Sequence, residues 1–127
     1  MKANLDSSRN IARIVGVLFI IGTVAGILSA VVLGGLLSGP DYLNLVASNA
    51  NRVTVGAVLI LVMAIALAMI PALMFPILKK HNEPLAIGYV IFRGALETLG
   101  YISLVVCWLL LIVVARQYVD SGASALF

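Results

Sequence analysis

Three long apolar runs, separated by short polar segments, dominate the hydrophobic pattern of the chain. They cover residues 14–37, 53–78 and 85–115. The first two runs contain no charged residue, whereas the third contains Arg93 and Glu97. A helix of about 20 residues crosses the hydrocarbon core of a bilayer, so each run is long enough to span it. The pattern therefore predicts an all-α membrane protein with three transmembrane helices.

The connections between the runs predict how the helices are arranged. Residues 38–52 begin with a break at Pro40 and Asp41, after which apolar residues recur at helical spacing. This segment is either a short interfacial helix anchored by Tyr42 or an ordinary loop. Residues 79–84 form a tight link, which makes the second and third helices antiparallel neighbours. We expect one membrane domain over residues 1–127, an antiparallel up-down bundle that ends in a short, poorly ordered tail at 116–127.

Composition and charge agree with a lipid-covered surface. The chain is 63% hydrophobic and 10% charged, against about 25% charged residues in soluble domains. Lysine and arginine gather at one end of the predicted bundle, as Lys2, Arg9, Arg13, Lys79 and Lys80, whereas Arg52 and Arg116 belong to the other. The positive-inside rule places the amino terminus in the cytoplasm and, after three spans, the carboxyl terminus outside a cell (inner or plasma) membrane. The first run is longer than a signal-peptide core, and we expect it to be retained.

Small residues recur every four positions along the first run, at Gly22, Gly26, Ala30 and Gly34. This spacing lets two helix backbones approach closely in lipid. The stripe is interpreted as an intrachain packing face, with a homodimer face or mere composition as alternatives. The second run offers a comparable surface at Ala64, Ala68 and Ala72. Pro71 interrupts its backbone hydrogen bonds and predicts a kink.

Polar residues recur every four positions along the third run, at Tyr89, Arg93, Glu97 and Tyr101. Arg93 and Glu97 are one turn apart, so they can pair. If Tyr89 and Trp108 mark the two interfaces, Glu97 lies near the midplane; if the uncharged run 98–115 is the core, both charges lie at the interface. We favour the deeper position. The pair either fixes helix packing or forms a substrate, ion or proton site, and Arg93 is also placed to donate to the Leu67 carbonyl that Pro71 leaves without a partner.

Other chemistry is sparse. His81 is the single histidine and Cys107 the single cysteine, so we expect no metal centre, no cofactor and no intrachain disulfide. The sequence offers no catalytic triad, paired carboxylates or phosphate loop, which argues against an enzyme. The basic residues flank membrane spans, so we do not expect nucleic acid as a partner.

Three motifs, in this order, resemble a bacterial membrane family known as domain of unknown function 4386. The motifs are Ala12-Arg13-x-x-Gly16-x-Leu18-Phe19, Pro76-x-Leu78-Lys79 and Ala86-x-Gly88-Tyr89-x-x-x-Arg93-x-x-x-Glu97. The resemblance covers about residues 9–115 and implies a helical membrane protein whose members usually have more helices, without implying an activity. It suggests a natural short form, a fragment, or a protomer that completes its bundle by oligomerising.

Two functions follow as hypotheses. The first is a non-enzymatic packing or accessory module that self-associates, alone or in a larger membrane complex. The alternative is a protomer of a small oligomeric transporter or channel in which Arg93 and Glu97 line the path; three helices enclose little space, so this alternative needs an oligomer.

Overall fold

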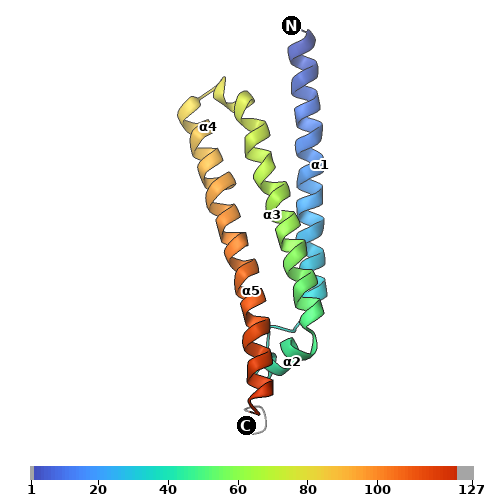
Figure 1. Ribbon diagram of the computed structural model, residues 1–127. Coiled ribbons are helices and arrows are strands. Elements are labelled where there is room, and N and C mark those ends of the chain that lie inside the picture. Colours follow the sequence, from blue (N-terminus) through green and yellow to red (C-terminus); the bar gives the residue numbers. More distant parts are fainter. Residues whose placement is uncertain (1, 123–127) are drawn as a thin grey trace.

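The computed structural model describes residues 2–122 and contains three long helical spans that run alternately up and down (Figure 1). The first span is α1 (Lys2–Leu33), the second is α3 (Ala50–Lys79), and a short helix α2 (Tyr42–Ser48) lies between them. The third span is one continuous helix made of α4 (Glu83–Tyr89), a π-helical segment η1 (Val90–Leu96) and α5 (Glu97–Asp120). All three spans are long and apolar enough to cross a bilayer. The predicted all-α bundle of three transmembrane helices and its short connecting helix are confirmed.

The helix α1 begins and ends at different residues from those predicted. It starts at Lys2, whereas the predicted span starts at residue 14. The apolar run marks only the part of the helix that suits lipid, and the polar turns before it are helical as well. It ends at Leu33 rather than residue 37. Gly34 follows with a φ of 50°, in the left-handed region, and donates its N–H to the Ala30 carbonyl at 2.9 Å. Gly34 therefore terminates the helix as a C-terminal cap and does not belong to the predicted packing stripe.

Asn82 sets the sharp turn between the second and third spans. Its side-chain oxygen accepts a hydrogen bond from the Leu85 N–H at 3.2 Å, and Pro84 occupies the first turn of α4. A proline suits that position because its missing N–H would have no partner inside the helix. Lys79 and Glu83 then bridge the turn with an ion pair at 3.3 Å.

The central helix of the molecule is α3, which packs against α1 on one side and against the third span on the other (Figure 1). It carries most of the buried residues, whereas α1 and α5 turn much of their apolar surface outward. Exposed side chains such as Phe92 and Val31 suit a lipid environment. Helix α3 continues through Pro71 and Pro76, and the kink at Pro71 stays a prediction.

The best-packed part of the core lies near the end at which α5 terminates. There Val46 of α2, Val53 of α3 and Ala115 of α5 are completely buried, with Leu33 and Ile112 beside them. The short helix α2 therefore packs against the bundle through Val46. Towards the amino terminus, α1 and α3 diverge (Figure 1).

The predicted tail needs correction as well: α5 continues to Asp120, and residues 123–127 lie outside the described part of the chain.

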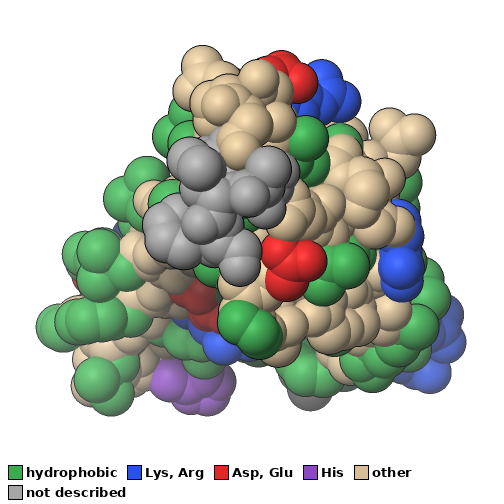
Figure 2. All heavy atoms as spheres, turned by 90° about the horizontal axis from the view of Figure 1, so that it is seen from below, with side chains coloured by type: hydrophobic (Ala, Val, Ile, Leu, Met, Phe, Trp, Pro, Cys, Tyr) green, Lys and Arg blue, Asp and Glu red, His purple; other side chains and the backbone are tan. Residues whose placement is uncertain are grey.

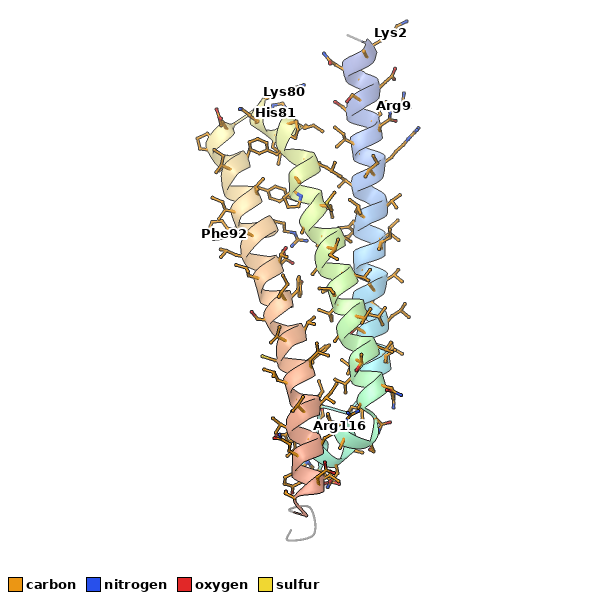
Figure 3. The ribbon with its side chains drawn as sticks, in the orientation of Figure 1. Lys2, Arg9, Lys80, His81, Phe92 and Arg116 are labelled. Carbon is orange, nitrogen blue, oxygen red and sulfur yellow. The ribbon has the colours of Figure 1, made fainter. Side chains whose placement is uncertain are left out.

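Charged side chains mark the two ends of the bundle. Lys2, Arg9 and Lys80 lie at the end that holds the amino terminus, and Arg116 lies at the opposite end (Figure 3). Seen from that opposite end, hydrophobic side chains make up much of the outline (Figure 2). We call the end that holds the amino terminus the basic end. It also carries Arg13 and Lys79, so the structure separates the basic residues as the sequence pattern predicts.

Candidate intramembrane polar site

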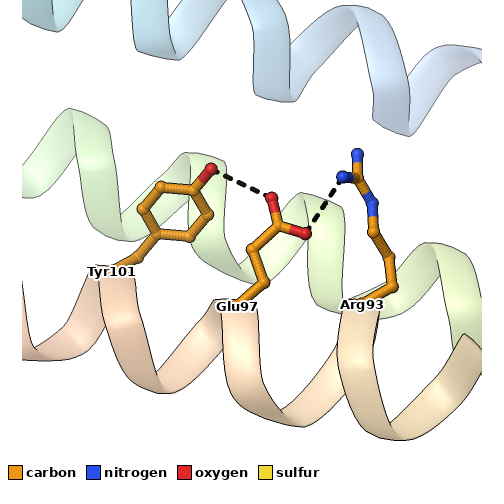
Figure 4. A network of polar contacts seen from close by, with 3 residues as sticks. All are labelled: Arg93, Glu97 and Tyr101. Atoms are coloured by element: carbon orange, nitrogen blue, oxygen red, sulfur yellow. Dashed lines mark hydrogen bonds and ion pairs between the residues drawn. The ribbon is translucent and has the colours of Figure 1, made fainter. Parts of the chain in front are cut away.

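Arg93, Glu97 and Tyr101 form one polar network along the third span (Figure 4). Arg93 Nη1 lies 3.0 Å from Glu97 Oε2, and the Tyr101 hydroxyl donates to Glu97 Oε1 at 3.0 Å. Both oxygens of the carboxylate are therefore engaged by groups on the same helix. The side chains project from the third span in the direction of α3 and α1 (Figure 4).

The predicted stripe of four polar residues divides into two parts. Tyr89 lies one turn before Arg93, yet no hydrogen bond joins it to the network within residues 2–122. Its side chain instead lines a cleft at the corner between α3 and α4. The structure thus brings Arg93, Glu97 and Tyr101 together and leaves Tyr89 apart.

The backbone at the network is a π-helix, which the sequence pattern does not predict. In η1 the hydrogen bonds reach five residues back, as from the Glu97 N–H to the Phe92 carbonyl. Such wide turns are rare and frequently occur at functional sites. On the inner side of η1, Gly94 faces Pro71: a Cβ on Gly94 would lie 3.7 Å from Pro71 Cβ. The two spans are therefore in contact at the level of the network, where a methyl group at position 94 would lie at ordinary van der Waals distance from the proline.

The sequence also predicts that Arg93 donates a hydrogen bond to the Leu67 carbonyl. This carbonyl lacks its helical donor because Pro71 has no N–H. No hydrogen bond joins Arg93 to this carbonyl among the described residues, so that expectation is wrong. The ion pair with Glu97 directs the guanidinium along its own helix instead.

The packing contacts align the spans with one another and so indicate how deep the network lies. Gly22 of α1 meets Leu67 of α3, where a Cβ on the glycine would lie 3.0 Å from Leu67 Cδ2. The two helices are antiparallel, so Ile14, about two turns before Gly22, lies level with Phe75, about two turns after Leu67. Ile14 begins the uncharged run of α1. The charge pattern of α1 thus puts one edge of the hydrocarbon at this level.

The contact between Pro71 and Gly94 transfers that edge to the third span. Val90 lies one turn before Gly94 and is level with Phe75, one turn after Pro71. Measured from Val90 at 1.5 Å per residue, Arg93 is about 4–5 Å inside the hydrocarbon and Glu97 is about 10 Å inside it. The register of the helices supports the deeper of the two positions considered for this pair.

The network is only partly covered within one copy of the chain. The side chain of Arg93 is 38% exposed and that of Glu97 is 25% exposed. Arg93 Nη1 is used by the ion pair, whereas no other hydrogen bond from the guanidinium is formed within residues 2–122. A charge in hydrocarbon costs at least about 2.5–3.5 kcal/mol, so this exposure of the two side chains is unfavourable in lipid.

The small residues of α1 lie at its contact with α3, but not all as predicted. Gly22 faces Leu67, and a Cβ on Gly26 would meet Met63 Sδ at 2.7 Å. Ala30, however, is exposed. It points away because the buried face of α1 continues through Ala25, Ser29 and Leu33. The interpretation of the stripe as an intrachain packing face is therefore wrong at Ala30 as well as at Gly34, and the homodimer face stays a prediction.

Ser29 and Gly56 are packing residues that the spacing argument missed. The buried Ser29 hydroxyl donates to the Gly56 carbonyl at 2.9 Å, and Leu33 closes over the same glycine. A nearby contact joins Arg52 Nε to the Val32 carbonyl at 3.1 Å. A lone serine in an apolar run and a lone glycine opposite it were the available signals, and neither repeats at a spacing that would single it out.

The geometry limits what the network can do chemically. Within residues 2–122 no three His, Cys, Asp or Glu side chains lie together in a group that could hold a metal ion. Glu97 is held as the acceptor of both an ion pair and a hydroxyl hydrogen bond. An arrangement of this kind favours a fixed, neutralised pair over a group that exchanges protons or ions.

Comparison with known proteins gives one family match. No curated protein and no solved structure matches the chain. The family model described as "Domain of unknown function (DUF4386)" matches residues 14–126 and so covers the apolar part of the first span, the other two spans and the polar network. The chain is an integral membrane protein that belongs to the DUF4386 family.

Proposed function

We propose that the chain is a non-enzymatic packing module of the membrane that associates with other copies of itself through the Arg93–Glu97–Tyr101 network. The observation that carries the proposal is an ion pair inside the hydrocarbon span whose two side chains remain 38% and 25% exposed. A second copy that covers the pair would remove it from lipid and provide acceptors for the remaining guanidinium donors. Interhelical polar contacts of this kind hold membrane helices together.

The transporter or channel alternative receives less support from the same contacts. A path-lining carboxylate has to exchange its partner for a substrate, an ion or a proton. Glu97 has both oxygens bound, one by Arg93 and one by Tyr101, so exchange would first break two contacts. A network in which both carboxylate oxygens are bound suits a packing role better.

The distribution of basic residues supports an orientation as part of the proposal. The basic end carries five lysine and arginine residues near span ends, against two at the opposite end. The positive-inside rule places the basic end, and the amino terminus with it, in the cytoplasm of a cell membrane, with the carboxyl terminus outside.

Self-association can be measured by energy transfer between copies in lipid vesicles. In a Cys107→Ala background, donor and acceptor dyes are attached to Ser121→Cys, and transfer is followed as the protein-to-lipid ratio falls. The unmodified network should give transfer that persists on dilution, whereas Arg93→Met combined with Glu97→Leu should lower it to the level of random proximity. Phe92→Leu combined with Leu99→Met is the matched control, because both side chains are exposed and apolar.

Two results would contradict the proposal. One is transfer at the random level for the unmodified network at every ratio. The other is equal association of the charge-free variant and the control. Circular dichroism of each variant shows whether the helices remain folded, which separates loss of association from loss of structure.

A further inference from the structure

An apolar cleft lies at the corner between α3 and α4, at the basic end of the molecule. Its volume is about 370 Å³. Met74 and Leu78 of α3 face Leu85 and Ala86 of α4 across it. His81 and Asn82 form its rim at the turn, and Tyr89 lines it at the side nearer the polar network. The walls are thus hydrophobic and the mouth is polar.

The position of the cleft along the bundle makes its apolar walls unusual. The packing contacts put Phe75 and Val90 level with Ile14, where the uncharged run of α1 begins and the hydropathy pattern puts the edge of the hydrocarbon. Leu78 and Leu85 lie beyond that edge by about 4–8 Å, at the depth of glycerol and headgroups. Leu85 is 72% exposed there. An apolar cleft at this depth suits an occupant with both a hydrophobic and a polar part.

Lys80, which directly precedes the rim residue His81, identifies the polar part. Lys79 is engaged by Glu83 at 3.3 Å and lies over the Phe75 ring at 6.0 Å. Lys80 has no acidic group within ion-pair distance among residues 2–122, and it lies next to His81 at the same end of the bundle (Figure 3). A lysine beside a polar rim at headgroup depth complements a phosphate, and basic clusters at this level attract anionic lipids.

We propose that this cleft binds one anionic phospholipid. The phosphate lies at Lys80 and the turn, and the glycerol and upper acyl chain occupy the space between Leu78 and Leu85. The chain then descends past Tyr89 into the hydrocarbon. This site is distinct from the polar network, and it does not depend on the proposed self-association.

Native mass spectrometry of the full chain, released from detergent with added lipid, tests the site. The probe is dioleoyl phosphatidylglycerol, compared with dioleoyl phosphatidylcholine, which has the same chains and no net charge. We expect one retained phosphatidylglycerol, favoured by about fivefold over phosphatidylcholine, a ratio set by one lysine at the headgroup. Lys80→Gln should remove the preference and Lys80→Arg should keep it. Leu85→Gln should weaken retention of both lipids, whereas Leu85→Met should not.

Matched changes at the other end separate a built site from general charge. Arg116→Gln removes one positive charge and should leave retention unchanged, as should Val119→Gln. The proposal is overturned if phosphatidylglycerol shows no preference, if Arg116→Gln acts as strongly as Lys80→Gln, or if glycerol phosphate without acyl chains competes as well as the lipid. It is also overturned if Leu85→Gln changes the proportion of dimer and not lipid retention, because the cleft would then be a contact between copies.

Discussion

Glu97 is the residue on which the polar network depends. Its carboxylate accepts from Arg93 on one oxygen and from Tyr101 on the other, so removing it would leave two donors without their partner. Because the register places this residue about 10 Å inside the hydrocarbon, water is not available there to replace the lost contacts. The energetic effect of a change at Glu97 should therefore depend strongly on what stands at position 93.

A double-mutant cycle at these two positions tests that dependence. Arg93→Gln or Glu97→Gln leaves one charge unpaired, and each should lower the free energy of unfolding in detergent by up to about 2.5–3.5 kcal/mol. Arg93→Met combined with Glu97→Leu should recover much of this loss, because neither charge is then stranded. The measurement is reversible denaturation at protein concentrations low enough to keep the chain monomeric.

The cycle has a clear contrary outcome. If both single changes are harmless, the pair lies among headgroups and water, and the depth inferred from the helix register is wrong. If the two losses simply add in the double variant, the side chains act separately and the network is not one unit.

At the residue scale, the sequence predicted the ion pair but not its surroundings. Spacing of four residues suffices to place Arg93 beside Glu97, since neighbours on a helix face follow from helical geometry alone. That Tyr101 donates to the carboxylate while Tyr89 turns to the cleft depends on the packing of α4 against α3. The π-helical backbone of η1, which packs against α3, was likewise not predicted, because no residue within it signals the wider turn.

At the scale of elements, the contact between α1 and α3 depends on glycine at the crossing. A Cβ on Gly22 would already lie 3.0 Å from Leu67, whereas one on Gly16 of the same helix would meet nothing within 4 Å. Gly22→Leu should therefore lower the free energy of unfolding by about 1–3 kcal/mol through overpacking. Gly16→Leu is the matched control and should be neutral or slightly stabilising, since leucine is a better helix former.

Thermal unfolding in detergent checks this pair of variants. Equal stability of the two would show that the α1–α3 interface adapts to a large side chain, and that the close approach at Gly22 carries no particular stabilisation. A larger loss at Gly16 would place the important contact of α1 on a different face, contrary to the observed burial of Gly22, Ala25, Ser29 and Leu33.

The extents of the helices show what the hydrophobic pattern can and cannot predict. An apolar run reports the part of a helix that lies in lipid, and it gave the existence and order of all three spans. It does not report helical turns that continue into water, which is why α1 begins at Lys2 and α5 continues to Asp120. The end of α1 was predicted too late because Gly34 belongs to the apolar run, yet its left-handed backbone stops the helix.

At the scale of the whole molecule, two polar features lie at different levels of the same half of the bundle. The basic end carries most of the lysine and arginine, and the Arg93–Glu97–Tyr101 network lies a few turns further in along the third span. The core is best packed at the opposite end, around Val46, Val53 and Ala115. In the half of the bundle nearer the basic end, α1 and α3 diverge (Figure 1). This half contains both the network proposed to join two copies and the cleft proposed to bind a lipid.

Orientation in the membrane is a property of the whole chain that the charge asymmetry predicts. Single cysteines in a Cys107→Ala background at Ser38, before α2, and at Ser121, after α5, lie at the end opposite the basic one. Both should react with a membrane-impermeant thiol reagent in intact cells, because the positive-inside rule keeps the basic end in the cytoplasm. A cysteine at His81, in the turn of the basic end, should react only after the cells are opened. Asn82 is unsuited to this purpose, since its side chain caps α4. The reverse labelling pattern would place the amino terminus outside, and labelling of all three sites in intact cells would mean that the chain takes both orientations.

Replacing Lys79 and Lys80 with glutamine should increase the share of inverted molecules in the same labelling experiment. The replacement lowers the basic end from five positive residues to three, while the other end keeps two.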